Sequence, residues 1–192
     1  MTRPEAPPEQ RSVKGSVIVD YLKIIRANPD LPWAEHLTPQ DLATLNLLIL
    51  PASWYPIELF QRMGVAIFKL VSREKYSVVH LFGRSLAERM SEGNPGMVSK
   101  GRPADTVKKF LAIQARLYSC KFFEGEEAGP GRILIYVNSR REDVGTRLLV
   151  EAMSGTVKRL VELSGGTNIR IKVLEAMWEG GERNKIEVAW DE

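Results

Sequence analysis

The chain has 192 residues, of which 44% are hydrophobic and 27% charged, with 27 basic and 24 acidic side chains and a net charge of +3. This composition excludes wholesale disorder, and the length suits one globular domain. Because both signs of charge are mixed along the whole chain, we do not expect nucleic acid as a partner. The single cysteine, Cys120, excludes an intramolecular disulfide and favours a reducing, cytoplasmic location.

The N-terminal segment and the longest apolar stretch bear on disorder and on membrane insertion. Residues 1–11 hold three prolines and four charged residues without an apolar run, which predicts a disordered lead-in before a single domain over residues 12–192. The longest apolar stretch, residues 42–56, is interrupted by Asn46 and Pro51 and is too short to cross a bilayer. We therefore expect no membrane span.

The first part of the chain has the periodicity of helices. Thr38, followed by Pro39 and Asp41, combines a capping hydroxyl, a proline suited to the first helical position and an early acid. Trp54-Tyr55-Pro56 is expected to open the helix that follows. Apolar spacing and Pro or Gly punctuation predict helices over residues 16–26, 38–49, 54–72, 76–90 and 103–118.

The last part of the chain changes character. The β-branched run 132–138 predicts a strand, paired with 121–124 across a turn over 125–131. A helix over 144–163 follows, and then strands over 168–178 and 185–190 around a glycine turn. The sequence therefore predicts an α+β fold, in which an N-terminal helical half packs on an antiparallel sheet of about four strands with one long helix between two hairpins.

The sequence carries no recognisable catalytic constellation. His36 and His80 do not have metal-ligand spacing, and Cys120 has no sequence signal of an activating base. Neither a phosphate-binding glycine loop nor a nucleophile elbow is present. We therefore expect a protein that is not an enzyme and has neither a metal nor another cofactor.

The segment 57–71 is apolar around most of its circumference. On a helical wheel Glu58, Arg62 and Lys69 fall within about 40° of one another, so only a narrow stripe faces water. Such a helix lies at the centre of the core, lines an apolar cavity or enters a subunit interface. The third alternative predicts a homodimer with Phe60 and Ile67 at the interface.

Several short motifs resemble a known family. They are Val13-Lys14-Gly15-Ser16, Trp54-Tyr55-Pro56, Leu81-Phe82-Gly83-Arg84, and Glu179-Gly180 with Glu187-Val188-Ala189-Trp190. Together they resemble a myxobacterial paralogous family of unknown function. That family is similar in layout to heme-nitric-oxide-binding domains, to the small-molecule-binding domains named after vinyl reductase, and to the Bet-three-like subunits of the TRAPP vesicle-tethering complex.

The resemblance also carries an expectation about heme. Heme-nitric-oxide-binding domains grip the heme propionates with a Tyr-x-Ser-x-Arg motif, which the run from Tyr136 to Arg140 resembles, with Asn138 in the place of the serine. They also use a proximal histidine, and no histidine lies between Leu81 and Tyr136. The resemblance therefore implies a module that binds no heme.

These observations leave two functional hypotheses. The first is a non-catalytic cytoplasmic sensor or small-molecule-binding signalling module that takes an unknown small apolar ligand. The alternative is a dimeric scaffold or adaptor that acts through a protein partner. The candidate ligand contacts are Trp54, Tyr55, Cys120, Tyr136, Asn138 and Arg140, although the last three also fit exposed positions at the end of a strand.

Overall fold

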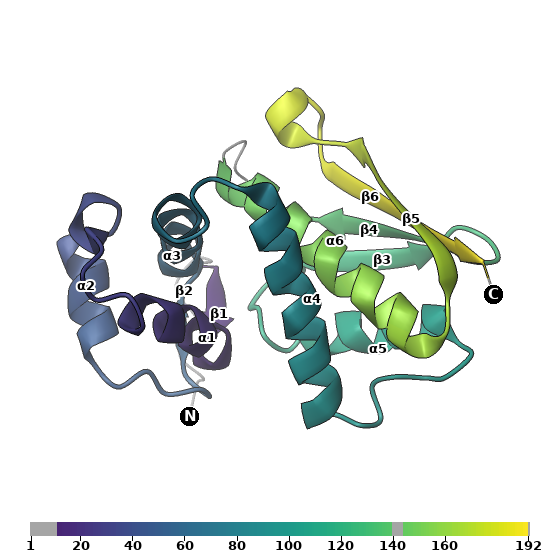
Figure 1. Ribbon diagram of the computed structural model, residues 1–192, viewed down its shortest axis with the longest axis horizontal. Coiled ribbons are helices and arrows are strands. Elements are labelled where there is room, and N and C mark those ends of the chain that lie inside the picture. The colour runs from purple at the N-terminus through teal and green to yellow at the C-terminus, as the bar shows by residue number, and fades with distance from the viewer. Residues whose placement is uncertain (1–10, 140–143, 192) are drawn as a thin grey trace, which may run out of the picture.

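The computed structural model describes residues 11–139 and 144–191, and it confirms the α+β fold (Figure 1). The N-terminal half contains β1 (Ser12–Lys14), α1 (Gly15–Arg26), the short 3-10 helix η1 (Trp33–Glu35), α2 (Pro39–Asn46), β2 (Trp54–Pro56) and α3 (Ile57–Leu70). The C-terminal half contains α4 (Tyr76–Gly93), α5 (Pro103–Gln114), β3 (Phe123–Glu127), β4 (Arg132–Val137), α6 (Val144–Ser164), β5 (Thr167–Glu175), the 3-10 helix η2 (Met177–Glu179) and β6 (Asn184–Asp191).

The C-terminal half is built on a four-stranded antiparallel sheet in the order β3-β4-β6-β5. Alternate residues of β4 (Ile133, Ile135 and Val137) are fully buried on the inner face, and Ile186 and Val188 of β6 lie beside them. Helices α5 and α6 contact this sheet, and Figure 1 shows α6 running across it. The predicted layout, with one long helix between two hairpins, is confirmed.

The N-terminal half differs from the sequence expectation at Trp54-Tyr55-Pro56. These residues form the strand β2, antiparallel to β1, with Val13 opposite Tyr55, and the helix begins only at Ile57. The preceding helix also ends at Asn46 instead of residue 49, because Leu47 has an extended backbone. Pairing with a strand some 40 residues earlier in the chain leaves no local signal, so helical periodicity alone could not reveal it.

Other boundaries also differ, among them that of the strand predicted over 168–178, which ends at Glu175 because Met177–Glu179 form η2. Helix α5 ends at Gln114, not at residue 118, because Tyr118 pairs with Val13 in an isolated bridge. The first hairpin turn is shorter than 125–131, since β3 continues through Gly125 to Glu127. Residues 1–10 of the expected lead-in lie outside the described residues, but Arg11 is part of the fold, where its guanidinium donates to the Asn138 carbonyl at 3.1 Å.

Helices α4 and α6 pack with their backbones in close approach. A Cβ on Gly83 would collide with the carbonyl oxygen of Ala152, and one on Gly155 would collide with the carbonyl oxygen of His80. Thr156 Oγ1 donates to the Gly83 carbonyl at 3.0 Å across the crossing.

Within the described part of the chain, no helix is long and apolar enough to cross a bilayer.

Candidate functional site between the two halves

Two cavities lie where the N-terminal half meets the C-terminal half. The first has a volume of about 200 Å³, is partly open to the surface and is lined by α1, α3, α4 and the start of α6. The second has a volume of about 280 Å³, is also partly open and is lined mainly by α1, α4, α5 and α6. Their walls are mostly hydrocarbon, with Ile24, Ile67, Phe68, Val78 and Leu148 in the first and Val17, Leu86, Met90, Phe110 and Met153 in the second.

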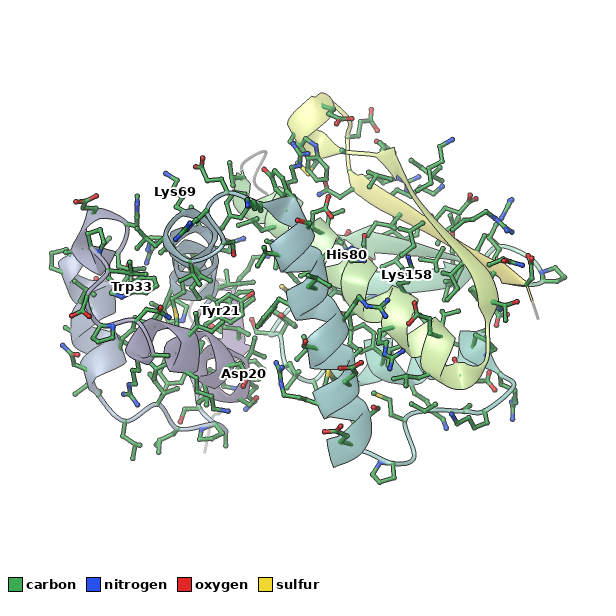
Figure 2. The ribbon with its side chains drawn as sticks, in the orientation of Figure 1. Asp20, Tyr21, Trp33, Lys69, His80 and Lys158 are labelled. Atoms are coloured by element: carbon green, nitrogen blue, oxygen red, sulfur yellow. The ribbon has the colours of Figure 1, made fainter. Side chains whose placement is uncertain are left out.

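Three aromatic rings from three helices separate the cavities. Tyr21, Phe60 and Phe82 line both cavities, as does Leu149. The ring centroids of Tyr21 and Phe60 are 4.8 Å apart, and those of Tyr21 and Phe82 are 5.7 Å apart in an edge-on arrangement. Figure 2 shows Tyr21 at the junction between α1 and α4. The rings thus form an aromatic partition that borders both cavities.

Each cavity carries a few polar groups. Gln61 and Ser72 are buried in the first, and neither side chain has a hydrogen-bond partner among the residues that the structure describes. In the second, the Gln114 amide lies 3.9 Å from the Met90 sulfur, and the Tyr118 hydroxyl has no described partner. A ligand with one or two hydrogen-bonding groups could use Gln61, Ser72 or Tyr118 without displacing an existing bond.

The walls carry almost no charge. In the described part of the chain neither lining contains Arg, Lys, His or Cys. Burial raises the pKa of the Tyr21 and Tyr118 hydroxyls, so both phenols stay neutral. Asp20 lies at the edge of the second cavity, where its carboxylate is 3.8 Å from Arg89 of α4 and 3.1 Å from Lys23. The arrangement suits an uncharged molecule.

Tyr136 and Asn138 lie outside the two cavities between the halves. They line a polar hollow on the outer face of the sheet together with Glu124, Glu126 and Arg183. The Tyr136 hydroxyl donates to Glu126 at 2.5 Å, which raises the pKa of Tyr136, and the Asn138 amide donates to Glu124 at 2.7 Å. Neither residue lines an apolar cavity, so the structure does not bring them together with the space between the halves.

The other predicted ligand contacts are also away from the cavities. Trp54 is exposed on β2, and the Tyr55 hydroxyl accepts a hydrogen bond from the Leu50 amide at 3.0 Å. Cys120 packs half-buried against the core without lining either cavity. Arg140 lies outside the described residues. The cavity geometry therefore gives these assignments no support.

The residues that make the partition were not predicted to act together. Phe60 was expected at a dimer interface; it is 4% exposed and contacts Tyr21 and Tyr118, so little of its ring is available to a second subunit in this fold. Ile67 is half-buried and lines the first cavity. Tyr21 carries only the signal of an amphipathic helix, which does not separate a cavity wall from a filled core.

Comparisons with known proteins support the fold. No protein-family model matches the sequence, and no curated protein matches it. Solved structures of H-NOX domains are similar along 93% of this chain. A single-site mutant of the H-NOX domain of T. tengcongensis is 12% identical with a TM-score of 0.61 over 98% of its chain. An H-NOX protein from S. oneidensis in the Fe(II)NO ligation state is 13% identical, with a TM-score of 0.61 over 99% of its chain.

An oxygen-binding H-NOX domain related to soluble guanylate cyclases, solved as its oxygen complex, is 13% identical with a TM-score of 0.59 over 95% of its chain. Identity this low shows a shared fold only. The expected similarity in layout to heme-nitric-oxide-binding domains is thereby confirmed, and the chain has the H-NOX fold.

Proposed function

We propose that this protein is a non-catalytic, heme-free sensor or signalling module that binds a small, uncharged, mostly apolar molecule between its two halves. The pair of hydrocarbon-lined cavities with unpaired amide and hydroxyl groups carries the proposal. The fold supports it, because similar domains have been solved as an oxygen complex and in an Fe(II)NO state. We further propose that the protein acts in the cytoplasm, since its one thiol suits a reducing compartment.

The residues around the cavities do not fit heme. An iron-bound heme needs an axial His, Cys, Met or Tyr ligand, and the described lining contains no His or Cys. The raised pKa of Tyr21 and Tyr118 opposes phenolate ligation, and the Met90 sulfur already receives the Gln114 amide. Met153 in the second cavity lacks the histidine with which methionine ligates heme in cytochromes c. The two propionates would also lack a described cation in the lining. An uncharged ligand avoids both problems.

The aromatic partition limits which ligand shapes the two cavities accept. One compact molecule fits either cavity, whereas an elongated molecule occupies both after Tyr21 turns aside. Gln61 and Ser72 at one end, and Gln114 and Tyr118 at the other, then fix its orientation through hydrogen bonds. Apolar contact supplies most of the affinity, at about 25 cal/mol per Å² of buried apolar surface before the cost of ordering the ligand.

A neutral fluorescent probe tests the proposal. The uncharged dye N-phenyl-1-naphthylamine should bind the wild type saturably with a blue-shifted emission. Gly64→Leu should weaken binding tenfold or more, because a Cβ at Gly64 already lies 3.4 Å from the Tyr21 ring and the longer side chain enters the first cavity. Gly93→Leu, at a helix end where a Cβ meets nothing within 4 Å, is the matched control.

Two outcomes would contradict the proposal. The cavity assignment fails if the wild type does not bind the dye saturably, or if Gly64→Leu binds it as well as Gly93→Leu does. The heme-free part fails if purified protein incubated with hemin develops a stoichiometric Soret band with a defined axial-ligand signature. Native mass spectrometry of the purified protein would in addition reveal a retained ligand directly.

The dimeric scaffold remains a second prediction, as does the resemblance to the myxobacterial family. Of the two interface candidates only Ile67 keeps some exposure. Light scattering of the wild type and of Ile67→Glu decides whether α3 contributes to a dimer: a dimer that becomes a folded monomer supports it. A wild type that is monomeric at high micromolar concentration contradicts it.

A further inference from the structure

The segment between α2 and β2 exposes an unusual amount of hydrocarbon. Of the ten large hydrophobic side chains that are exposed in the described residues, four lie within residues 47–54, which we call the apolar loop. They are Leu47, Leu48, Leu50 and Trp54, and Leu48 is 82% exposed. No charged residue occurs from position 42 to position 57. Figure 1 shows this segment along the edge of the N-terminal half.

The apolar loop is held in place by hydrogen bonds. The Gly15 and Ser16 amides donate to the carbonyls of Ser53 and Pro51 at 2.9 and 3.0 Å. Ile49, in the middle of the loop, is buried in the core. The neighbouring leucines therefore point outward because the backbone is fixed, and none of them lines either cavity. Exposure of this kind marks an interaction surface.

Cations accompany the exposed leucines. The Lys14 ammonium lies 4.0 Å from the centroid of the Trp54 ring and donates to the Ala52 carbonyl at 2.7 Å. The exposed Arg26 guanidinium donates to the Leu45 carbonyl at 3.3 Å. Basic side chains thus bind the backbone on both sides of Leu47, Leu48 and Leu50 in the sequence.

We infer that the apolar loop inserts Leu47, Leu48, Leu50 and Trp54 into the interfacial layer of an anionic lipid bilayer. Protruding leucines suit a fluid phase, which needs no matching groove, and tryptophan is favoured at the level of the headgroups. Lys14 and Arg26 would meet the lipid phosphates. A second copy of the chain is a poorer occupant, because two-fold pairing of this surface would bring Lys14 of one copy towards Arg26 of the other, and both are positively charged.

Vesicle flotation of the full chain tests the inference. The wild type should float with vesicles of phosphatidylcholine and phosphatidylserine, and far less with phosphatidylcholine alone or in high salt. Leu48→Ser should lower the partition coefficient about tenfold, as expected for losing one buried leucine. Leu81→Ser is the matched control, because Leu81 is also an exposed leucine, 60% exposed on α4.

Fluorescence locates the contact. Brominated lipid should quench Trp54 emission, and Trp54→Phe should remove most of the quenching, because Trp33 and Trp190 are buried and the half-buried Trp178 lies in η2 of the C-terminal half. The inference is overturned if the wild type does not bind the mixed vesicles at low salt, or if Leu48→Ser and Leu81→Ser float equally well. It is also overturned if the protein does not bind the vesicles and instead forms a dimer that Leu48→Ser dissociates.

Discussion

The crossing of α4 and α6 offers a sharp test of the packing that shapes the second cavity. Gly83→Ala adds one methyl group at the point where α4 meets the backbone of α6. The obstacle is the carbonyl oxygen of Ala152, with the Thr156 amide nitrogen 3.0 Å from the new Cβ. Backbone atoms in the middle of a helix cannot turn aside as a side chain does, so the helices must separate.

The expected change combines opposing effects. Alanine gains about 1 kcal/mol over glycine inside a helix. Overpacking costs about 1–3 kcal/mol, or more against a rigid obstacle. Separation also weakens the hydrogen bond from Thr156 to the Gly83 carbonyl, worth about 1 kcal/mol. We expect a net loss of about 2 kcal/mol in the free energy of unfolding, or a Tm lower by about 4–8 °C.

Urea unfolding followed by far-UV circular dichroism measures the effect. Gly93→Ala in the same helix is the control, since its new Cβ meets open space, and its stability should stay within about 1 kcal/mol of the wild type. The probe-binding assay gives a second readout, because Ala152 and Thr156 line the second cavity. Equal stability of Gly83→Ala and Gly93→Ala would refute the close-packed crossing.

Three other substitutions have defined outcomes. Burial opposes ionisation of Asp41, but hydrogen bonds from Arg62 and Thr38 outweigh it and lower its pKa. Its stabilisation is therefore fully present above about pH 4 and is lost as pH falls through the lowered pKa, so Asp41→Asn should cost about 1–3 kcal/mol at pH 7 in urea unfolding and progressively less as the pH is lowered below about 4. Phe60→Glu should unfold the protein, because the carboxylate replaces a buried ring, and circular dichroism measures the loss of structure. Arg89→Ala should raise both association and dissociation rates of the neutral dye in stopped-flow measurements, because it removes the ion pair with Asp20 at the edge of the second cavity.

Local signals in the sequence were sufficient for much of the fold. Thr38 caps the start of α2 as predicted, and Asp41, predicted only as an early acid that favours the helix dipole, also accepts a hydrogen bond from the Thr38 amide. The alternation of Ile133, Ile135 and Val137 places the same three residues on the buried face of β4. In both cases the chain within a few residues determines the result.

Contacts between distant segments were beyond that reasoning. Trp54-Tyr55-Pro56 is extended because β1 pairs with it, and the partition arises because Tyr21, Phe60 and Phe82 come from three different helices. Each of these rings alone has the pattern of an ordinary core residue. Whether such rings fill a core or border a cavity depends on the spacing of whole helices, which in this chain is set partly by backbone contacts such as that at Gly83.

The apolar circumference of α3 illustrates how such contacts decide between interpretations. Its wheel indicated more apolar surface than one side of a small domain buries. The structure covers that surface from within the chain, because α3 contacts both α1 and α6, and Phe60 enters the partition. Its polar stripe is also partly internal, since Arg62 holds the Asp41 carboxylate with two hydrogen bonds of 2.7 Å. The apolar surface of α3 therefore does not require a second subunit to cover it. The exposed apolar side chains are concentrated instead in residues 47–54, beyond the end of α2.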